Sequence, residues 1–157
     1  MHRKKFELWH SLVATVAISA FEAILVAMAH DLAHIVAIVC ASLGGAALIY
    51  VSTEVIREVR NPERMYLLLA AVIFEFIAFF AVQYWLVSVA SPGSYPGLAI
   101  DPISLFLHST MVFALNPLYI PTNSIARTLM LLNTVESLVL GLFVLQNIWQ
   151  IRSEKST

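Results

Sequence analysis

The sequence predicts an all-α integral membrane protein with four membrane-spanning helices and one shorter, re-entrant helix. After this short helix the chain returns to the side of the membrane from which it entered. The chain of 157 residues is 60% hydrophobic and only 12% charged, which leaves too little polar side-chain surface for a soluble domain of this size. Four apolar runs reach or approach the about 20 residues that a bilayer requires, and they lie near 8–29, 33–56, 66–90 and 125–149. Between the last two lies an apolar stretch that is too short and too broken by proline to span.

The distribution of basic residues predicts the topology. Of the 9 Lys and Arg residues, all but Arg127 fall before the first apolar run, between the second and third, or after the fourth. By the positive-inside rule, both termini are cytoplasmic, and we expect the plasma (inner) membrane. The first run is interpreted as a retained helix and not as a signal peptide, because it is too long and contains Glu22.

The stretch after the third run predicts a short helix with a defined start. Residues 91–97 are rich in Ser, Pro and Gly, which ends the preceding helix. Asp101 followed by Pro102 is typical of a helix N-cap with proline at the first helical position, so we expect a helix over 102–114. At about 1.5 Å per residue this helix is about 18 Å long, which is too short to cross a bilayer.

Two prolines after this helix predict an extended return. In Asn116-Pro117 and Ile120-Pro121 the proline disfavours helix at the residue before it, so we expect 115–121 to be extended. Seven residues at about 3.3 Å each cover about 23 Å, enough to return beside the helix. Non-helical backbone at membrane depth is stable only if protein buries it or a water-filled cavity borders it. We therefore expect several copies of the chain around an axis in the lipid bilayer.

Two runs in the second half of the chain carry a family resemblance. One is Asp101-Pro102-Ile103-Ser104-Leu105-Phe106-Leu107-His108-Ser109-Thr110, and the other is Val135-Glu136-Ser137-Leu138-Val139-Leu140-Gly141-Leu142. They resemble the D-A-L-Y-F-S-V-V-T and E-A-L-x-G-L patterns of the potassium-channel superfamily. The resemblance implies a pore module over 63–157, with an outer helix, a turret, a pore helix over 102–114, a filter-like loop over 115–121 and an inner helix over 124–151. Residues 1–62 remain outside it as a peripheral two-helix membrane segment.

The segment at the filter position departs from the family. The family filter reads T-V-G-Y-G-D, whereas this chain has no glycine between Gly97 and Gly141. A potassium filter depends on stacked carbonyl rings whose backbone relies on glycine, so the architecture is carried over and the potassium selectivity is not. Asn116 offers both a carbonyl and an amide, and a packing role is favoured for Tyr119. The residues expected to line the filter and pore are Ala114, Leu115, Asn116, Pro117, Leu118 and Tyr119.

Intramembrane polar residues are candidates for supporting the filter. Glu136 has two interpretations: an acid hydrogen-bonded behind the filter to His108, Ser109 or Thr110, or a neutral acid that packs two helices. His108 and Thr110 are the matching filter-support candidates on the pore helix.

Glycines in two predicted helices are candidates for a hinge or for close packing. Gly141 is either a gating hinge, as the resemblance implies, or a site where helices approach closely. The pair Gly44-Gly45 is interpreted as a packing notch.

His30 and His34 form the one constellation that suggests metal chemistry. In a helix their spacing places both imidazoles on one face, beside Asp31, but no third ligand is near in sequence. A solvated turn is favoured over a metal or haem site, and no cofactor is expected. The single Cys40 excludes an intrachain disulfide, and the net charge of −1 does not indicate a nucleic-acid partner.

These features predict an ion channel of the potassium-channel-like pore-loop class, with no catalytic residues and no enzyme activity. In a fourfold assembly the C-terminal ends of the pore helices place partial negative charge at the axis, which favours weakly selective conduction of monovalent cations. The main alternative is a non-conducting scaffold or regulatory protein that keeps the pore fold, with the loop closed by Leu115, Leu118 and Ile120. A third alternative is a membrane protein that binds metal or haem through its histidines.

Overall fold

The computed structural model describes residues 33–57 and 62–154, together with six single positions, 13, 16, 17, 20, 21 and 24. Within 33–57 and 62–154 the chain forms four α-helices and no strand, which confirms the predicted all-α class. The helices are α2 (Ala33–Arg57), α3 (Pro62–Ala90), α4 (Pro102–Phe113) and α5 (Ser124–Glu154). The predicted spanning helix near 8–29 lies outside the described residues apart from those six positions.

Three of the helices are long and apolar enough to cross a membrane. The qualifying segments are Ile35–Thr53 in α2, Glu63–Ala90 in α3 and Ser124–Trp149 in α5. They correspond to three of the four predicted apolar runs. This length and composition are those of an integral membrane protein.

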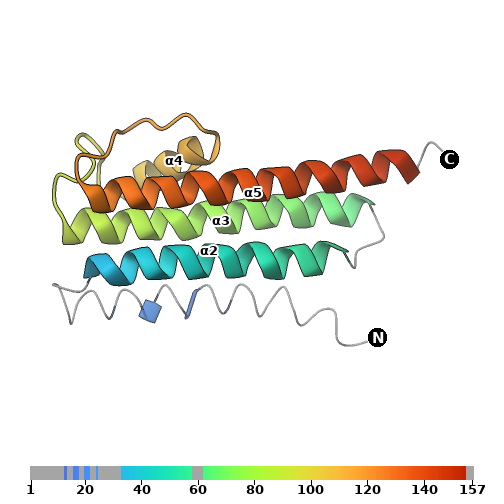
Figure 1. Cartoon of the computed structure of the whole chain (residues 1–157), viewed down its shortest axis with the longest axis horizontal. Helices are drawn as coiled ribbons and strands as arrows, with labels where there is room; N and C mark the ends of the chain where they lie inside the picture. Colours follow the sequence, from blue (N-terminus) through green and yellow to red (C-terminus); the bar gives the residue numbers. More distant parts are fainter. Residues whose placement is uncertain are drawn as a thin grey trace.

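The three long helices run side by side along the long axis of the molecule, and α4 lies at the end where α3 finishes and α5 begins (Figure 1). Helix α3 contacts each of the other three, while α4 packs against both α3 and α5. Aromatic rings fill the core around α3: the centroid of Phe80 is 4.9 Å from that of Phe76 and 5.4 Å from that of Phe79. Helix α3 is therefore the scaffold on which α4 is positioned.

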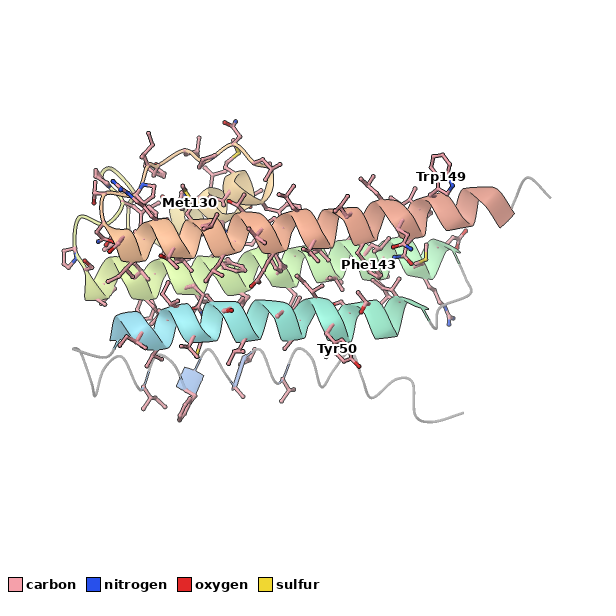
Figure 2. All side chains as sticks on the ribbon, viewed as in Figure 1. Tyr50, Met130, Phe143 and Trp149 are labelled. Carbon is pink, nitrogen blue, oxygen red and sulfur yellow. The ribbon has the colours of Figure 1, made fainter. Side chains whose placement is uncertain are left out.

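Large apolar side chains also cover the outside of the bundle. Figure 2 shows Tyr50 projecting outward from α2 and Trp149 projecting outward from α5, and these side chains are 68% and 77% exposed. Both lie within the halves of their helices that lead to basic residues, Arg57 and Arg152. Aromatic rings beside basic residues are typical of the membrane interface.

The glycine pair of α2 receives one side chain from each neighbouring long helix. A Cβ atom at Gly44 would lie 2.6 Å from Cζ of Phe79 in α3, and a Cβ atom at Gly45 would overlap Oε2 of Glu136 in α5. No residue larger than glycine fits either contact without a shift of the neighbour. The predicted packing notch is confirmed.

Candidate pore loop

Helix α4 begins where the sequence predicts. Asp101 has extended backbone (φ −122°, ψ 154°), and its Oδ1 accepts hydrogen bonds from the backbone N–H groups of Ile103 and Ser104, both at 3.0 Å. Hydrogen bonding, first from the Ser104 side chain and then from its backbone, lowers the pKa of Asp101. Pro102 follows in the first turn. The N-cap is confirmed, and it fixes the point at which the chain enters α4.

The C-terminal half of α4 lies against the middle of α3. The ring centroids of Phe113 and Phe76 are 6.0 Å apart, and Ser109 Oγ donates a 2.8 Å hydrogen bond to the carbonyl of Ile77. Helix α3 ends at Ala90, so Phe76 lies about 21 Å from that end at about 1.5 Å per residue. The end of α4 is therefore level with the midpoint of a helix long enough to span a bilayer.

Helix α4 ends in a Schellman motif with leucine at the left-handed position. Leu115 has φ 59°; its N–H donates to the carbonyl of Val112 at 2.9 Å, and the N–H of Asn116 donates to the carbonyl of Met111 at 2.8 Å. Glycine usually occupies this position, because left-handed backbone costs other L-residues about 1–2 kcal/mol. The prediction that the whole of 115–121 is extended is wrong at Leu115, where the hydrogen bonds that end the helix reverse the chain.

Most side chains predicted to line a pore are exposed in the single chain. Ala114, Leu115, Asn116, Pro117 and Leu118 all lie on the surface, with Leu115 exposed by 53% and Leu118 by 47%. The structure thus brings these five positions together on an open turn at the end of α4. Nothing in the described chain covers them.

Tyr119, in contrast, packs inward. Its ring centroid lies 5.4 Å from that of His108, and its Cε1 would be 3.6 Å from a Cβ atom at Gly97. Gly97 has φ 84°, a backbone conformation that favours glycine. Tyr119 is in the packing position that the sequence favoured over a place at the pore mouth.

Asn123 fastens the end of the loop to the turn that follows α3. Its Oδ1 accepts a 2.8 Å hydrogen bond from the N–H of Ala126, so it caps α5. Its Nδ2 donates to the hydroxyl groups of Ser91 at 3.1 Å and Ser94 at 2.7 Å, and the N–H of Thr122 donates to the carbonyl of Ser94 at 3.0 Å. The segment from α3 to α5 therefore begins and ends at the same end of the bundle.

His108 is fully buried in a box of three tyrosine rings. Its ring centroid lies 4.6 Å from that of Tyr84, 5.2 Å from that of Tyr95 and 5.4 Å from that of Tyr119. Within the described residues neither imidazole nitrogen has a hydrogen-bond partner. Burial lowers the pKa of His108 to about 4, so the ring is neutral at pH 7. His108 thus joins α3, the turn after it and the return segment by packing.

The hydrogen bonds around this box come from residues that the sequence analysis did not select. Asn133 Nδ2 donates to Tyr84 Oη at 3.0 Å, and Ser137 Oγ donates to Asn133 Oδ1 at 3.1 Å. Tyr95 Oη donates to the carbonyl of Ala126 at 2.8 Å, and burial raises the pKa of Tyr95. Asn133 was detectable in principle, because an amide in a spanning helix needs a partner.

The structure does not join the predicted filter-support residues. Thr110 Oγ1 donates a 2.8 Å hydrogen bond to the carbonyl of Phe106 in its own helix. Glu136 is buried against Gly45 of α2, its Oε2 has no hydrogen-bond partner within the described residues, and no hydrogen bond connects it to α4. The interpretation of Glu136 as hydrogen-bonded behind the filter is therefore wrong for this geometry. The alternative, an acid packed between two helices, is the arrangement observed.

Gly141 has room for a side chain. A Cβ atom at this position would meet no atom within 4 Å. Close helix packing within the described chain therefore does not explain this glycine. The hinge interpretation stays a prediction.

The metal alternative remains a prediction. Within the described residues there is no group of three or more His, Cys, Asp or Glu side chains that could hold a metal ion. His30 and Asp31 lie outside the described residues, and His34 lies in the first turn of α2.

Comparison of the chain with models of protein families, with curated proteins and with solved structures finds no match of any of these three kinds. The class is accordingly defined by the fold: an all-helical chain, over the described residues, with three helices able to cross a membrane and a short one packed at one end.

Proposed function

We propose that the protein is an oligomeric ion channel of the pore-loop class, in which α4 and the return segment 114–123 form a re-entrant loop. The observation that carries the proposal is the contact between Phe113 and Phe76. If α3 spans the bilayer, this contact sets the end of α4 near the membrane centre, while the N-cap Asp101 and the anchor Asn123 stay near one surface. A chain that enters the membrane as a helix, turns near the membrane centre and returns to the same side has the geometry of a pore loop.

The exposure of the return segment in the single chain supports an oligomeric assembly. Non-helical backbone at mid-depth must be buried in protein or border a water-filled cavity, and residues 114–118 are exposed in the single chain. The outer face of α4 is apolar and open as well, with Ile103 exposed by 80% and Leu107 by 50%. Copies arranged around an axis would bury these apolar side chains and leave the loop at the axis. A homotetramer is the assembly that the sequence resemblance implies.

Charge and side-chain chemistry support weak selectivity for monovalent cations. The C-terminal end of α4 carries the partial negative charge of the helix dipole, and Asn116 adds an amide carbonyl next to it. There is no Asp or Glu between Asp101 and Glu136 and no Lys or Arg other than Arg127 in that range. A fixed ring of carboxylates is thus absent from the loop, and carbonyl and amide groups would carry the coordination.

The proposal is tested by recording from the purified full-length protein in planar bilayers under potassium, sodium and chloride gradients. Asn116→Asp would add one carboxylate per subunit at the axis and is expected to raise both cation conductance and selectivity over chloride. Ser124→Asp is the matched control, because it adds the same charge at the exposed start of α5. Electrical silence of the wild type and of both variants, or a monomer in native-state mass measurements, would overturn the proposal.

A non-conducting scaffold is the second candidate, and one observation favours it. Leu115, Leu118 and Ile120 are exposed by 53%, 47% and 79%, and three apolar side chains at an axis could exclude water. Replacing all three with serine would then open a leak in an assembly whose wild type is silent. If the wild type conducts, this candidate is eliminated.

A further inference from the structure

Glu136 occupies a site in the middle of the bundle that the proposed pore loop does not use. It is the thirteenth residue of a 26-residue spanning segment, Ser124–Trp149, and its side chain is 9% exposed. Its Oε2 lies where a Cβ atom of residue 45 would be, so the carboxyl group rests directly on the backbone of α2. Only glycine at position 45 leaves this space open.

Among the residues that the structure describes, no cation is placed to pair with this carboxyl group. The sequence contains no Lys or Arg in 6–56, 65–126 or 128–151. Along α5 the nearest is Arg127, nine residues away, which is about 13 Å at about 1.5 Å per residue. Within the described residues Glu136 Oε2 has no hydrogen-bond partner either.

Over 33–57 and 62–154, the other titratable groups near the centre of the bundle are also unable to supply a positive charge. On α2 they are Cys40 and Tyr50, and Tyr50 points outward. On α3 they are Glu75, which has a partner of its own, and Tyr84, which accepts from Asn133. On α4 the group is His108, which is enclosed by tyrosines and is neutral at pH 7.

We propose that Glu136 and the Gly45 notch form a proton-binding latch between α5 and α2. The protonated, uncharged acid sits in the notch and holds the two helices together. When the proton leaves for solvent, the carboxylate has no counter-charge in the notch, and an unpaired charge inside a membrane is strongly disfavoured. The side chain must then leave the notch, and α5 separates from α2. The proton is thus the ligand of this site, whether or not the loop conducts.

Two single variants separate the parts of the latch. Glu136→Gln keeps the shape of the acid and cannot ionise, so the two helices stay together at every pH. Gly45→Ala places a methyl group where Oε2 lies and should open the latch at every pH, and Gly141→Ala is its matched control, because a Cβ atom there meets nothing within 4 Å. Gly45→Ala/Glu136→Ala removes the overlapping atoms and should recover part of the lost stability.

The measurements use the full-length protein in detergent micelles and do not need ion current. We expect the melting temperature of the wild type to fall as pH is raised from mildly acidic to alkaline, that of Glu136→Gln to change much less, and that of Gly45→Ala to be low throughout. Infrared spectra of the wild type at neutral pH should contain a carbonyl band of a protonated carboxyl group that Glu136→Gln lacks.

Three outcomes would overturn the latch: equal pH profiles for wild type and Glu136→Gln, a Gly45→Ala variant as stable as Gly141→Ala, or no infrared band lost in Glu136→Gln. A silent but pH-responsive protein would contradict the pore-loop proposal alone.

Discussion

Phe113, the last residue of α4, lies against Phe76 with their rings at 62° and their centroids 6.0 Å apart. This edge-on contact ties the end of a 12-residue helix to the midpoint of a 29-residue one. It sets how far the chain descends between α3 and α5 before it turns.

Leu115→Gly is expected to stabilise the protein. The left-handed backbone at Leu115 (φ 59°) costs a leucine about 1 kcal/mol or more relative to glycine, and the variant removes that cost. Thermal unfolding in detergent should show a higher melting temperature. Leu115→Ala is the control, because it shortens the side chain and keeps the strain. A lower melting temperature for the glycine variant than for the alanine variant would contradict this account.

Gly44→Ala is expected to destabilise the contact between α2 and α3 by about 1–3 kcal/mol. The new methyl group would lie 2.6 Å from Cζ of Phe79. Because the aromatic ring is rigid, the whole side chain or the helix must move to relieve this contact. Phe79→Leu should make room for the methyl group, so the double variant should lose less stability than the sum of the two single variants. Thermal unfolding of all four proteins gives the interaction energy. Simple additivity would mean that the two positions are not in contact.

Asp101→Ala is expected to remove the pH dependence that the N-cap of α4 confers. The pKa of Asp101 is lowered in the folded chain from its usual 3.8. The stability from the carboxylate is therefore fully present above the unfolded pKa and is lost as pH falls through the folded pKa. Asp101→Asn keeps an acceptor without titrating and should be flat in the same range. Melting curves in acid compare the three proteins, and an unchanged acid transition in Asp101→Ala would contradict the assignment.

His108→Phe is expected to leave stability unchanged at pH 7 or to raise it by about 1–3 kcal/mol, because it removes two buried nitrogens that lack partners. The wild type should also lose stability as pH falls from 6.5 towards about 4, since the unfolded imidazole binds a proton there and the folded one does not. The phenylalanine variant should lose less over that range. A large loss of stability in His108→Phe at pH 7 would instead indicate ordered water on the nitrogens.

Gly141→Ala is expected to fold normally and to gain up to about 1 kcal/mol from helix propensity, because the added Cβ atom meets nothing within 4 Å. If Gly141 is a hinge, the variant should open less often in single-channel recordings although its melting temperature is equal or higher. Unchanged opening together with normal stability would eliminate the hinge. A lower melting temperature would point to a contact with a neighbouring subunit.

Sequence features that act over a few neighbouring residues predicted most of the helices and the N-cap of α4. The apolar runs near 33–56, 66–90 and 125–149 gave the three spanning helices because length and hydropathy are properties of a segment alone. Asp101-Pro102 gave the start of α4 because an N-cap depends on neighbouring residues. The prediction of extended backbone over 115–121 is wrong at Leu115, because the conformational restrictions that proline imposes do not indicate left-handed backbone at a leucine.

The sequence did not indicate which side chains of one helix contact which residues of another. Glu136 could be recognised as an intramembrane acid, but its partner depends on which face of α5 meets α2. The resemblance suggested the pore helix, and the structure instead places the acid on Gly45. The tyrosine box around His108 likewise joins α4 to three other segments, which are α3, the turn after it and the return segment.

The sequence by itself determined that this is a helical chain with several segments able to cross a membrane, and where its short helix starts, because hydropathy and capping act over a few neighbouring residues. Only the tertiary structure decided how deep α4 reaches along α3, that Tyr119 packs inward while Leu115 to Leu118 stay open, and which helix receives Glu136. These outcomes depend on shape: the fit of Phe113 on Phe76 and the space left by two glycines exist only once the helices are packed together.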